Sequence, residues 1–323
     1  TALGARALDA NTTAASNTAI GRLSLTNNTT GANNTAVGHA SLSSQTTADA
    51  NTAVGVQAGQ AITTGIRNTA VGWQALYTST TQNYNTAIGT GALYTSVAEN
   101  GTAVGYYAAV NNTTGAEITA IGKGALSANT TGNYNTAVGK DALQNNTTAG
   151  DNTAVGYRAL TANVTGGDNC AFGDSSLASN LASNNVAYGR ESLAANTTGT
   201  RNTALGNYAL TVQTTQNDNC AVGYRALRDN TGVDNTGVGA NALYLNTSGQ
   251  NNTACGSSAL DSNTTASGNT AVGRMALATV TNFGNMTAVG FNALANNSTG
   301  QENTAMGSNC MGAMTSGNYN DAY

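Results

Sequence analysis

The chain has 323 residues and a net charge of −4; only 8% of its residues are charged, 39 are glycine and none is proline. Charge this sparse supplies neither a nucleic-acid surface nor a polybasic membrane anchor, and no apolar run approaches the roughly 20 residues of a membrane span. We therefore expect no nucleic-acid partner and no membrane insertion. The composition is also not that of a disordered chain, because Val, Ile and Leu recur at regular intervals.

A four-residue block of the form Thr-Ala-Val-Gly recurs along the whole chain, ending first at Gly4 and last at Gly307. Its 19 copies lie 17 residues apart, except for three intervals of 16 that precede Gly105, Gly189 and Gly239. The full unit is N-T-A-V-G-x-x-A-L-x-x-N-T-T-G-x-x. A fixed period is the signature of a solenoid. We predict one continuous repeat region over residues 1–323 without an internal boundary. Because both ends fall inside a repeat and lack a cap, we expect a segment of a longer fibre chain.

The elements of one unit follow in chain order. T-A-V-G predicts a short strand, and the residue before its Gly is apolar in every copy, which favours a buried position. The A-L block, with Leu in 16 of 19 copies, predicts a second short strand with a buried Leu. In each 16-residue interval the missing residue falls between this Leu and the next Thr position. The stretch x-N-T-T-G-x-x is therefore predicted to be the turn that closes the coil, where deletions are tolerated.

Together these elements predict an all-β fold, a parallel β-solenoid (β-roll or β-helix) with 17 residues per coil and about 19 coils. A helix of the same period would place Gly, Asn and Thr in interiors that they disfavour. Asn stands four residues before Gly in 15 of 18 copies, and its amide is expected to form a hydrogen-bonded ladder along the axis. Adjacent strand residues face opposite sides, so either the Ala or the Val column faces outward. We expect self-association, as a homotrimer or a lateral fibre assembly, to cover that column.

The N-T-A-V-G-x-x-A-L unit resembles the head repeats of YadA-like trimeric autotransporter adhesins, whose S-V-A-I-G motif builds a left-handed parallel β-roll. It is also similar to the repeats of phage tail-fibre-like proteins that carry a C-terminal self-cleaving (endosialidase-type) chaperone. The resemblance covers the whole chain and implies a trimeric fibre at a cell or virion surface. Two differences from the adhesin repeat are Thr in place of Val and a longer unit.

Residues for catalysis or metal binding are few and scattered. His39 is the only histidine and stands at a variable surface position after Gly38. Cys170 and Cys220 share one repeat position three coils apart, about 14 Å along the axis, beyond the roughly 7 Å between Cα atoms that a disulfide allows. We expect four free thiols, with cross-chain pairing at a symmetry axis as the alternative. The acidic residues form no pair in unequal environments. We predict that the chain is not an enzyme and uses no cofactor or metal.

Aromatic residues just after the strand Gly give a candidate ligand-facing surface on one side of the solenoid. A row of aromatic side chains would suit stacking on sugar rings. Intervening coils carry Lys, Asp, Arg or Ser at the same position, so the alternative interpretation is that these are scattered surface residues without a shared ligand. These residues are Trp73, Tyr106, Tyr157, Tyr224 and Phe291.

Sequons of the form N-x-S/T recur in the predicted turn, where we expect them to be exposed. They would be glycan acceptors in a eukaryotic secretory pathway. In a bacterial or phage protein, the same residues would serve only to form the turn. They begin at Asn28, Asn112, Asn129, Asn146, Asn196, Asn263 and Asn297.

The sequence thus favours a structural shaft or head of an extracellular or virion-surface fibre that holds an adhesive tip at a distance. One alternative is an adhesin that binds cell-surface glycans or receptors along the solenoid. A more remote alternative is ice binding, because Thr fills the first strand position in 16 of 19 copies.

Overall fold

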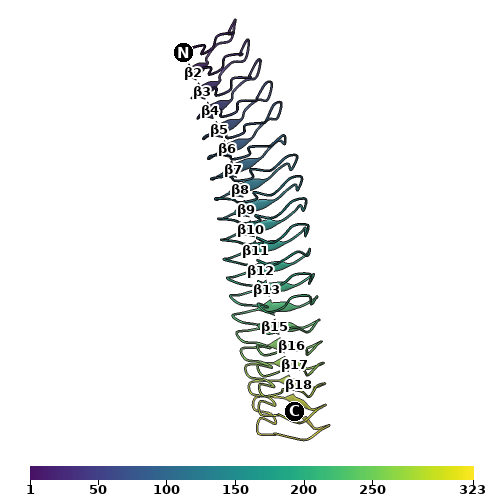
Figure 1. The fold of residues 1–323 in the computed structure, drawn as a ribbon. Coiled ribbons are helices and arrows are strands. Elements are labelled where there is room, and N and C mark those ends of the chain that lie inside the picture. Colours follow the sequence, from purple (N-terminus) through teal and green to yellow (C-terminus); the bar gives the residue numbers. More distant parts are fainter. The chain divides into compact units, whose positions relative to one another are not determined.

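The computed structural model describes residues 1–323, which contain strands and turns and no helix (Figure 1). The residues form two compact units, Thr1–Gly167 and Asp168–Tyr323. Each unit has ten short strands. In the first unit they are β1 (Ala2–Leu3), β2 (Thr18–Ile20), β3 (Thr35–Val37), β4 (Thr52–Val54), β5 (Thr69–Val71), β6 (Thr86–Ile88), β7 (Thr102–Val104), β8 (Thr119–Ile121), β9 (Thr136–Val138) and β10 (Thr153–Val155).

The second unit repeats the same design. Its strands are β11 (Cys170–Phe172), β12 (Val186–Tyr188), β13 (Thr203–Leu205), β14 (Cys220–Val222), β15 (Thr236–Val238), β16 (Thr253–Cys255), β17 (Thr270–Val272), β18 (Thr287–Val289), β19 (Thr304–Met306) and β20 (Asp321–Ala322).

Within each unit, every strand pairs in parallel with the strand one repeat further on. Thr35 pairs with Thr52 and Ala36 with Ala53. The pairing survives a 16-residue interval unchanged, since Thr86 pairs with Thr102. One strand per coil, stacked in register, is a parallel β-solenoid, which confirms the predicted fold class and the place of the deletions. Whether residues 1–323 form one region without a boundary stays a prediction. The structure contains no helix of the length and apolarity that a membrane crossing requires.

The middle residue of each strand faces the interior of the coil, and the residues on either side face outward. Ala36 is fully buried, whereas Thr35 and Val37 are partly exposed. The expectation that the apolar residue before Gly is buried is therefore wrong. Adjacent side chains of a strand point to opposite faces, so with Ala36 inward its two neighbours face outward, and the small alanine leaves room for the buried leucine of the same coil.

The expected second strand is also absent, because the A-L block lies in two consecutive hydrogen-bonded turns. In one coil the N–H of Ser41 donates to the carbonyl of Gly38 at 3.4 Å, and the N–H of Gln45 donates to the carbonyl of Leu42 at 3.2 Å. Leu42 has a φ of 48°, a left-handed conformation that costs about 1–2 kcal/mol for a residue with a Cβ. Complete burial of this leucine contributes about 1.5–3 kcal/mol and offsets that cost.

The interior contains two columns of amide side chains. One is the predicted ladder four residues before Gly: Asn34 donates its N–H to Oδ1 of Asn17 at 2.8 Å, and its Nδ2 donates to the carbonyl of Ala48 at 2.8 Å. The other uses the asparagine of N-T-T-G, where Nδ2 of Asn129 donates to Oδ1 of Asn112 at 2.7 Å. The first ladder is confirmed, and the second was not predicted. Both satisfy polar backbone atoms that water does not reach.

Candidate functional site

The two residues that follow each strand glycine, together with the two that follow the buried leucine, form an outward-facing edge of the coil, here called the turn edge. All five predicted aromatic residues lie on it and are exposed, as in Trp73 (47%) and Tyr106 (48%). The sequence therefore placed them correctly on the surface. Whether any of them contacts a ligand is a separate question, which depends on what surrounds each ring.

In the first unit, three further tyrosines join Trp73 and Tyr106 on neighbouring coils. Tyr77 and Tyr94 stack with ring centroids 5.1 Å apart and an interplanar angle of 6°. The rings of Tyr106 and Tyr107 lie 4.1 Å apart at 39°. Tyr77, Tyr94 and Tyr107 were not among the predicted residues, which all stand at the position directly after Gly. The sequence could have predicted the contact between Tyr77 and Tyr94, because they occupy the same repeat position in consecutive coils.

Two adjoining hollows open between these rings. The first, about 380 Å³, has Trp73 and Tyr94 in its wall. The second, about 260 Å³, has Lys123 and Gln144 in its wall. We call the pair the aromatic groove. Three residues line both hollows and join them: Tyr107, Val110 and Asn111.

Glycine replaces a side chain at two points of the turn edge beside this groove. A Cβ on Gly91 would lie 2.5 Å from the ring of Tyr107, and a Cβ on Gly124 would lie 2.8 Å from Oδ1 of Asp141. The Tyr107 ring therefore leans over Gly91, and the Asp141 carboxylate leans over Gly124. A hydrogen bond with Tyr106, together with its charge, raises the pKa of Tyr107 above its ordinary value.

Charges around the aromatic groove are balanced. Nζ of Lys140 lies 3.5 Å from Oδ2 of Asp141, and Nζ of Lys123 lies 5.8 Å from the ring centroid of Tyr106. The side-chain amide of Gln144 makes no hydrogen bond within the chain. The groove thus combines ring faces, opposite charges and a free amide.

The other three predicted aromatics are each covered by a neighbouring cation. Nζ of Lys140 lies 5.2 Å from the ring centroid of Tyr157, Cζ of Arg225 lies 4.9 Å from that of Tyr224, and Cζ of Arg274 lies 5.8 Å from that of Phe291. The structure does not bring these rings together with Trp73 and Tyr106. Cation–π contacts of this kind stabilise exposed side chains by about 0.5–1 kcal/mol.

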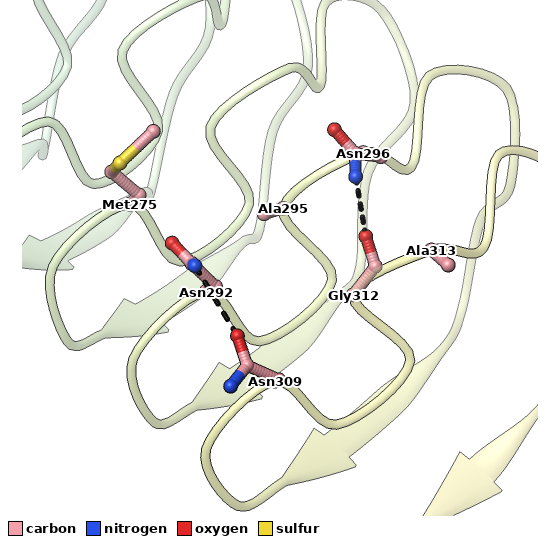
Figure 2. Close-up of a pocket in the computed structure, with 7 residues that line it drawn as sticks. All are labelled: Met275, Asn292, Ala295, Asn296, Asn309, Gly312 and Ala313. Carbon is pink, nitrogen blue, oxygen red and sulfur yellow. Dashed lines mark hydrogen bonds between the residues drawn. The ribbon is translucent and has the colours of Figure 1, made fainter.

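A further hollow, about 410 Å³, lies on the turn edge of the second unit, beside Met275 (Figure 2). Its amides bond to the protein itself: Nδ2 of Asn292 donates to Oδ1 of Asn309 at 3.2 Å, and Nδ2 of Asn296 donates to the carbonyl of Gly312 at 2.6 Å (Figure 2). No aromatic ring or charged side chain lines it. This hollow offers a ligand few groups for specific binding.

The expectation that the turn sequons are exposed is wrong. Each sequon asparagine is fully buried, and its Nδ2, the atom that would carry a glycan, is turned into the coil in most of them, as in Asn129, where it also donates to the carbonyl of Gly132 at 3.0 Å. A glycan on this atom would require the side chain to leave the interior. The folded structure is therefore incompatible with glycosylation at Asn28, Asn112, Asn129, Asn146, Asn196, Asn263 and Asn297.

No group of three or more His, Cys, Asp or Glu side chains gathers in a way that would hold a metal ion. His39 is exposed, and its Nε2 lies 3.2 Å from Nη1 of Arg22. The four cysteines are free thiols within this chain. Burial raises the pKa of Cys170 and of Cys220, which makes both thiols poor nucleophiles at neutral pH.

The outward residues of the strands form a second feature, the outer apolar column. It contains the residue before each strand Gly, and none of them is charged. Several are well exposed, such as Ile88 (39%) and Tyr188 (56%). The column is Leu3, Ile20, Val37, Val54, Val71, Ile88, Val104, Ile121, Val138 and Val155 in the first unit, and Phe172, Tyr188, Leu205, Val222, Val238, Cys255, Val272, Val289 and Met306 in the second.

No protein-family model, curated protein or solved structure matches this chain.

Proposed function

We propose that this chain is a non-catalytic structural segment of a fibre on a cell or virion surface, and that copies of it assemble side by side, as a homotrimer or a lateral array. The observation that carries the proposal is the outer apolar column. A side chain that points outward from a sheet is under no packing constraint within its own chain, yet this position stays apolar in all 19 copies. Long exposed apolar surfaces of this kind mark interfaces.

The regular register of the strands supports assembly with parallel chains. Within each unit, the outward side chains repeat at the spacing of parallel strands, about 4.8 Å, as in Val54 beside Val71. Two parallel copies present the same period to each other and can interdigitate coil by coil. Unit 2 adds larger side chains to the column, where the rings of Phe172 and Tyr188 stack at 4.9 Å.

The amide ladders support a role as a spacer. Within each unit, each coil hydrogen-bonds to the next through backbone and side-chain groups, so stability grows with the number of coils and does not depend on a wide core. Surface positions vary freely while the interior stays constant. This combination suits an element that sets a distance between two other parts of a fibre.

The proposal is tested by placing charge on the outer apolar column. The double substitution Val71→Lys and Val104→Lys should shift sedimentation of the purified chain from an oligomer to a monomer, while the circular dichroism spectrum stays unchanged. The control is Thr90→Lys, at a turn-edge position where Lys123 and Lys140 stand in other coils. A monomer before any substitution, or an oligomer that the double substitution leaves intact, would overturn the proposal.

A second candidate function, ice binding, is favoured by one specific observation. Between Thr18 and Val155, nine consecutive strands each place Thr and Val or Ile outward, while the intervening Ala is buried. The Ala that follows each Thr and the residue that precedes it, which is Asn in seven of the nine strands, face inward and do not interrupt this array. Ice binding predicts measurable thermal hysteresis that Thr86→Lys lowers. Absence of thermal hysteresis in the unsubstituted chain removes this candidate.

A further inference from the structure

We propose that the aromatic groove of the first unit binds a neutral oligosaccharide. The ring of Trp73 is exposed, and the ring of Tyr107 is held against Gly91, so that both line the same hollow. The faces of aromatic rings carry partial negative charge, and the C–H groups on the apolar face of a pyranose ring carry partial positive charge. Two such rings in one open groove suit a ligand with flat apolar faces and polar edges.

The polar groups of the groove suit the hydroxyl groups of a sugar. The side-chain amides of Asn111 and Gln144 make no hydrogen bond within the chain, and each supplies a donor and an acceptor. Thr95 lines the same wall as Asn111, although its hydroxyl donates to the carbonyl of Val110 at 3.0 Å. Ligand sites commonly combine an apolar, aromatic lining with a few polar groups of this kind.

The charge balance argues for a neutral ligand. Asp141 is paired with Lys140, and Lys123 lies over the Tyr106 ring, so the groove has no cluster of unpaired cations that would favour a phosphate, a sulfate or a nucleic acid. The length of the groove argues for a chain rather than a single sugar. From Trp73 to Gln144 it crosses five coils, which is about 19 Å at the spacing of parallel strands.

The sequence around the groove departs from the repeat at the positions that shape its two hollows. Along the repeat position two after Gly, the residues of these five coils are Gln74, Gly91, Tyr107, Gly124 and Asp141. Glycine occurs at this position in no other coil, although a positive φ is adopted there throughout. The two glycines let the side chains of the next coils fold over the backbone and shape the hollows.

Trp73 is the only tryptophan of the chain, so its fluorescence reports on the groove alone. The experiment titrates the purified chain with cellotetraose, chitotetraose and maltotetraose, and with a heparin-derived tetrasaccharide as the anionic comparison. We expect a saturable change of Trp73 emission with at least one neutral tetrasaccharide. Tyr107→Ala should weaken binding by about tenfold or more, as expected for the loss of a central aromatic contact.

Two further variants make the test specific. Gly91→Ala keeps every ring but displaces that of Tyr107, and it should weaken binding as Tyr107→Ala does; other coils carry non-glycine residues at this position with a positive φ, so folding is retained. Tyr157→Ala, which removes an exposed ring outside the groove, should leave the affinity unchanged. The monomeric Val71→Lys and Val104→Lys variant should also bind, because the groove lies on the turn edge.

Three results would overturn the inference. They are the absence of a saturable change with any neutral tetrasaccharide up to the millimolar range, binding of the heparin fragment alone, and binding that Tyr107→Ala and Gly91→Ala leave intact. None of these results bears on side-by-side assembly, so the two proposals fail independently.

Discussion

A Cβ on Gly38 would lie 2.5 Å from the carbonyl oxygen of Gly55, the equivalent glycine of the next coil. Gly38 also has a φ of 129°, in a region that residues with a Cβ rarely adopt. Coil stacking and backbone conformation therefore both demand glycine here. The same relationship recurs between successive strand glycines within each unit, which explains why this residue never varies.

Gly38→Ala should destabilise the chain by about 2–4 kcal/mol, because strain in φ and a backbone clash add. Hydrogen–deuterium exchange should show faster exchange in β3 and β4 than in distant strands. Gly307→Ala is the matched control: its φ is 131°, but the nearest atom to its Cβ would be 3.7 Å away, on Cys310. If Gly307→Ala lost as much stability as Gly38→Ala, the clash of the Cβ with the backbone of the next coil would contribute nothing to the loss.

Asn129→Ala should cost about 2–3 kcal/mol, because it breaks the turn-asparagine ladder in the middle. Nδ2 of Asn129 donates to Oδ1 of Asn112 at 2.7 Å, and its Oδ1 accepts from Nδ2 of Asn146 at 2.8 Å. Both partners are left buried with an unmade hydrogen bond. Chemical denaturation measures the loss. Asn145→Ala, at an exposed turn-edge position, should change stability by less than about 0.5 kcal/mol, and equal losses at the two sites would contradict the ladder's role.

One coil replaces the usual Leu and Asn of the interior by Gly59 and Ile62. A Cβ on Gly59 would lie 3.0 Å from Cδ1 of Ile62 and 3.0 Å from Cδ2 of Leu42, so Ile62 fills the volume that the leucine occupies elsewhere. Gly59→Leu alone should overpack the interior and cost about 1–3 kcal/mol. Ile62→Asn alone should leave a cavity.

The double variant Gly59→Leu with Ile62→Asn restores the ordinary coil and should be close to the unsubstituted chain in stability. The double-mutant cycle, measured by denaturation, should give a favourable coupling of about 1–3 kcal/mol. Additive losses would mean that the two side chains do not share one volume.

The thiols should differ in reactivity. Burial raises the pKa of Cys170 and Cys220, so at a given pH a smaller fraction of each is thiolate, and their alkylation should become fast only at higher pH. Cys255 is exposed on the outer apolar column and should react first in the monomeric Val71→Lys and Val104→Lys variant. In the assembled chain, Cys255 should be protected. Mass spectrometry after iodoacetamide treatment measures each site, and equal alkylation of Cys255 in monomer and assembly would contradict burial of the column.

The period, the strand positions and the site of the deletions could be predicted from the sequence because they depend on strict repetition. The direction of each side chain could not. The position of Val37 is apolar in every copy, as a core position would be. Alternation along a strand allows either Val37 or Ala36 to face inward, and the packing of the whole coil decides for Ala36. Leu42 is buried as predicted, but its left-handed conformation carries no local sequence signal, so the sequence predicts a strand where the structure has a turn.

The buried sequons and the aromatic groove show a related limit. Asn129 stands in an N-T-T-G segment that is typical of exposed turns, and its burial depends on hydrogen bonds to neighbouring coils that no single repeat reveals. The groove depends on departures from the repeat, such as Gly91 beneath Tyr107, and such departures do not appear in the consensus unit. Comparison of consecutive coils at each repeat position would have found them.

Side-by-side assembly through the outer apolar column is the central claim, and the mass of the chain in solution tests it most directly. Native mass spectrometry of the purified chain, supported by light scattering, counts the copies in the particle. We predict a stable oligomer, with three copies if the resemblance to trimeric adhesins and tail fibres extends to assembly. A well-folded monomer of 32.1 kDa at all concentrations would contradict the claim and leave the outer face of the strands free for another role.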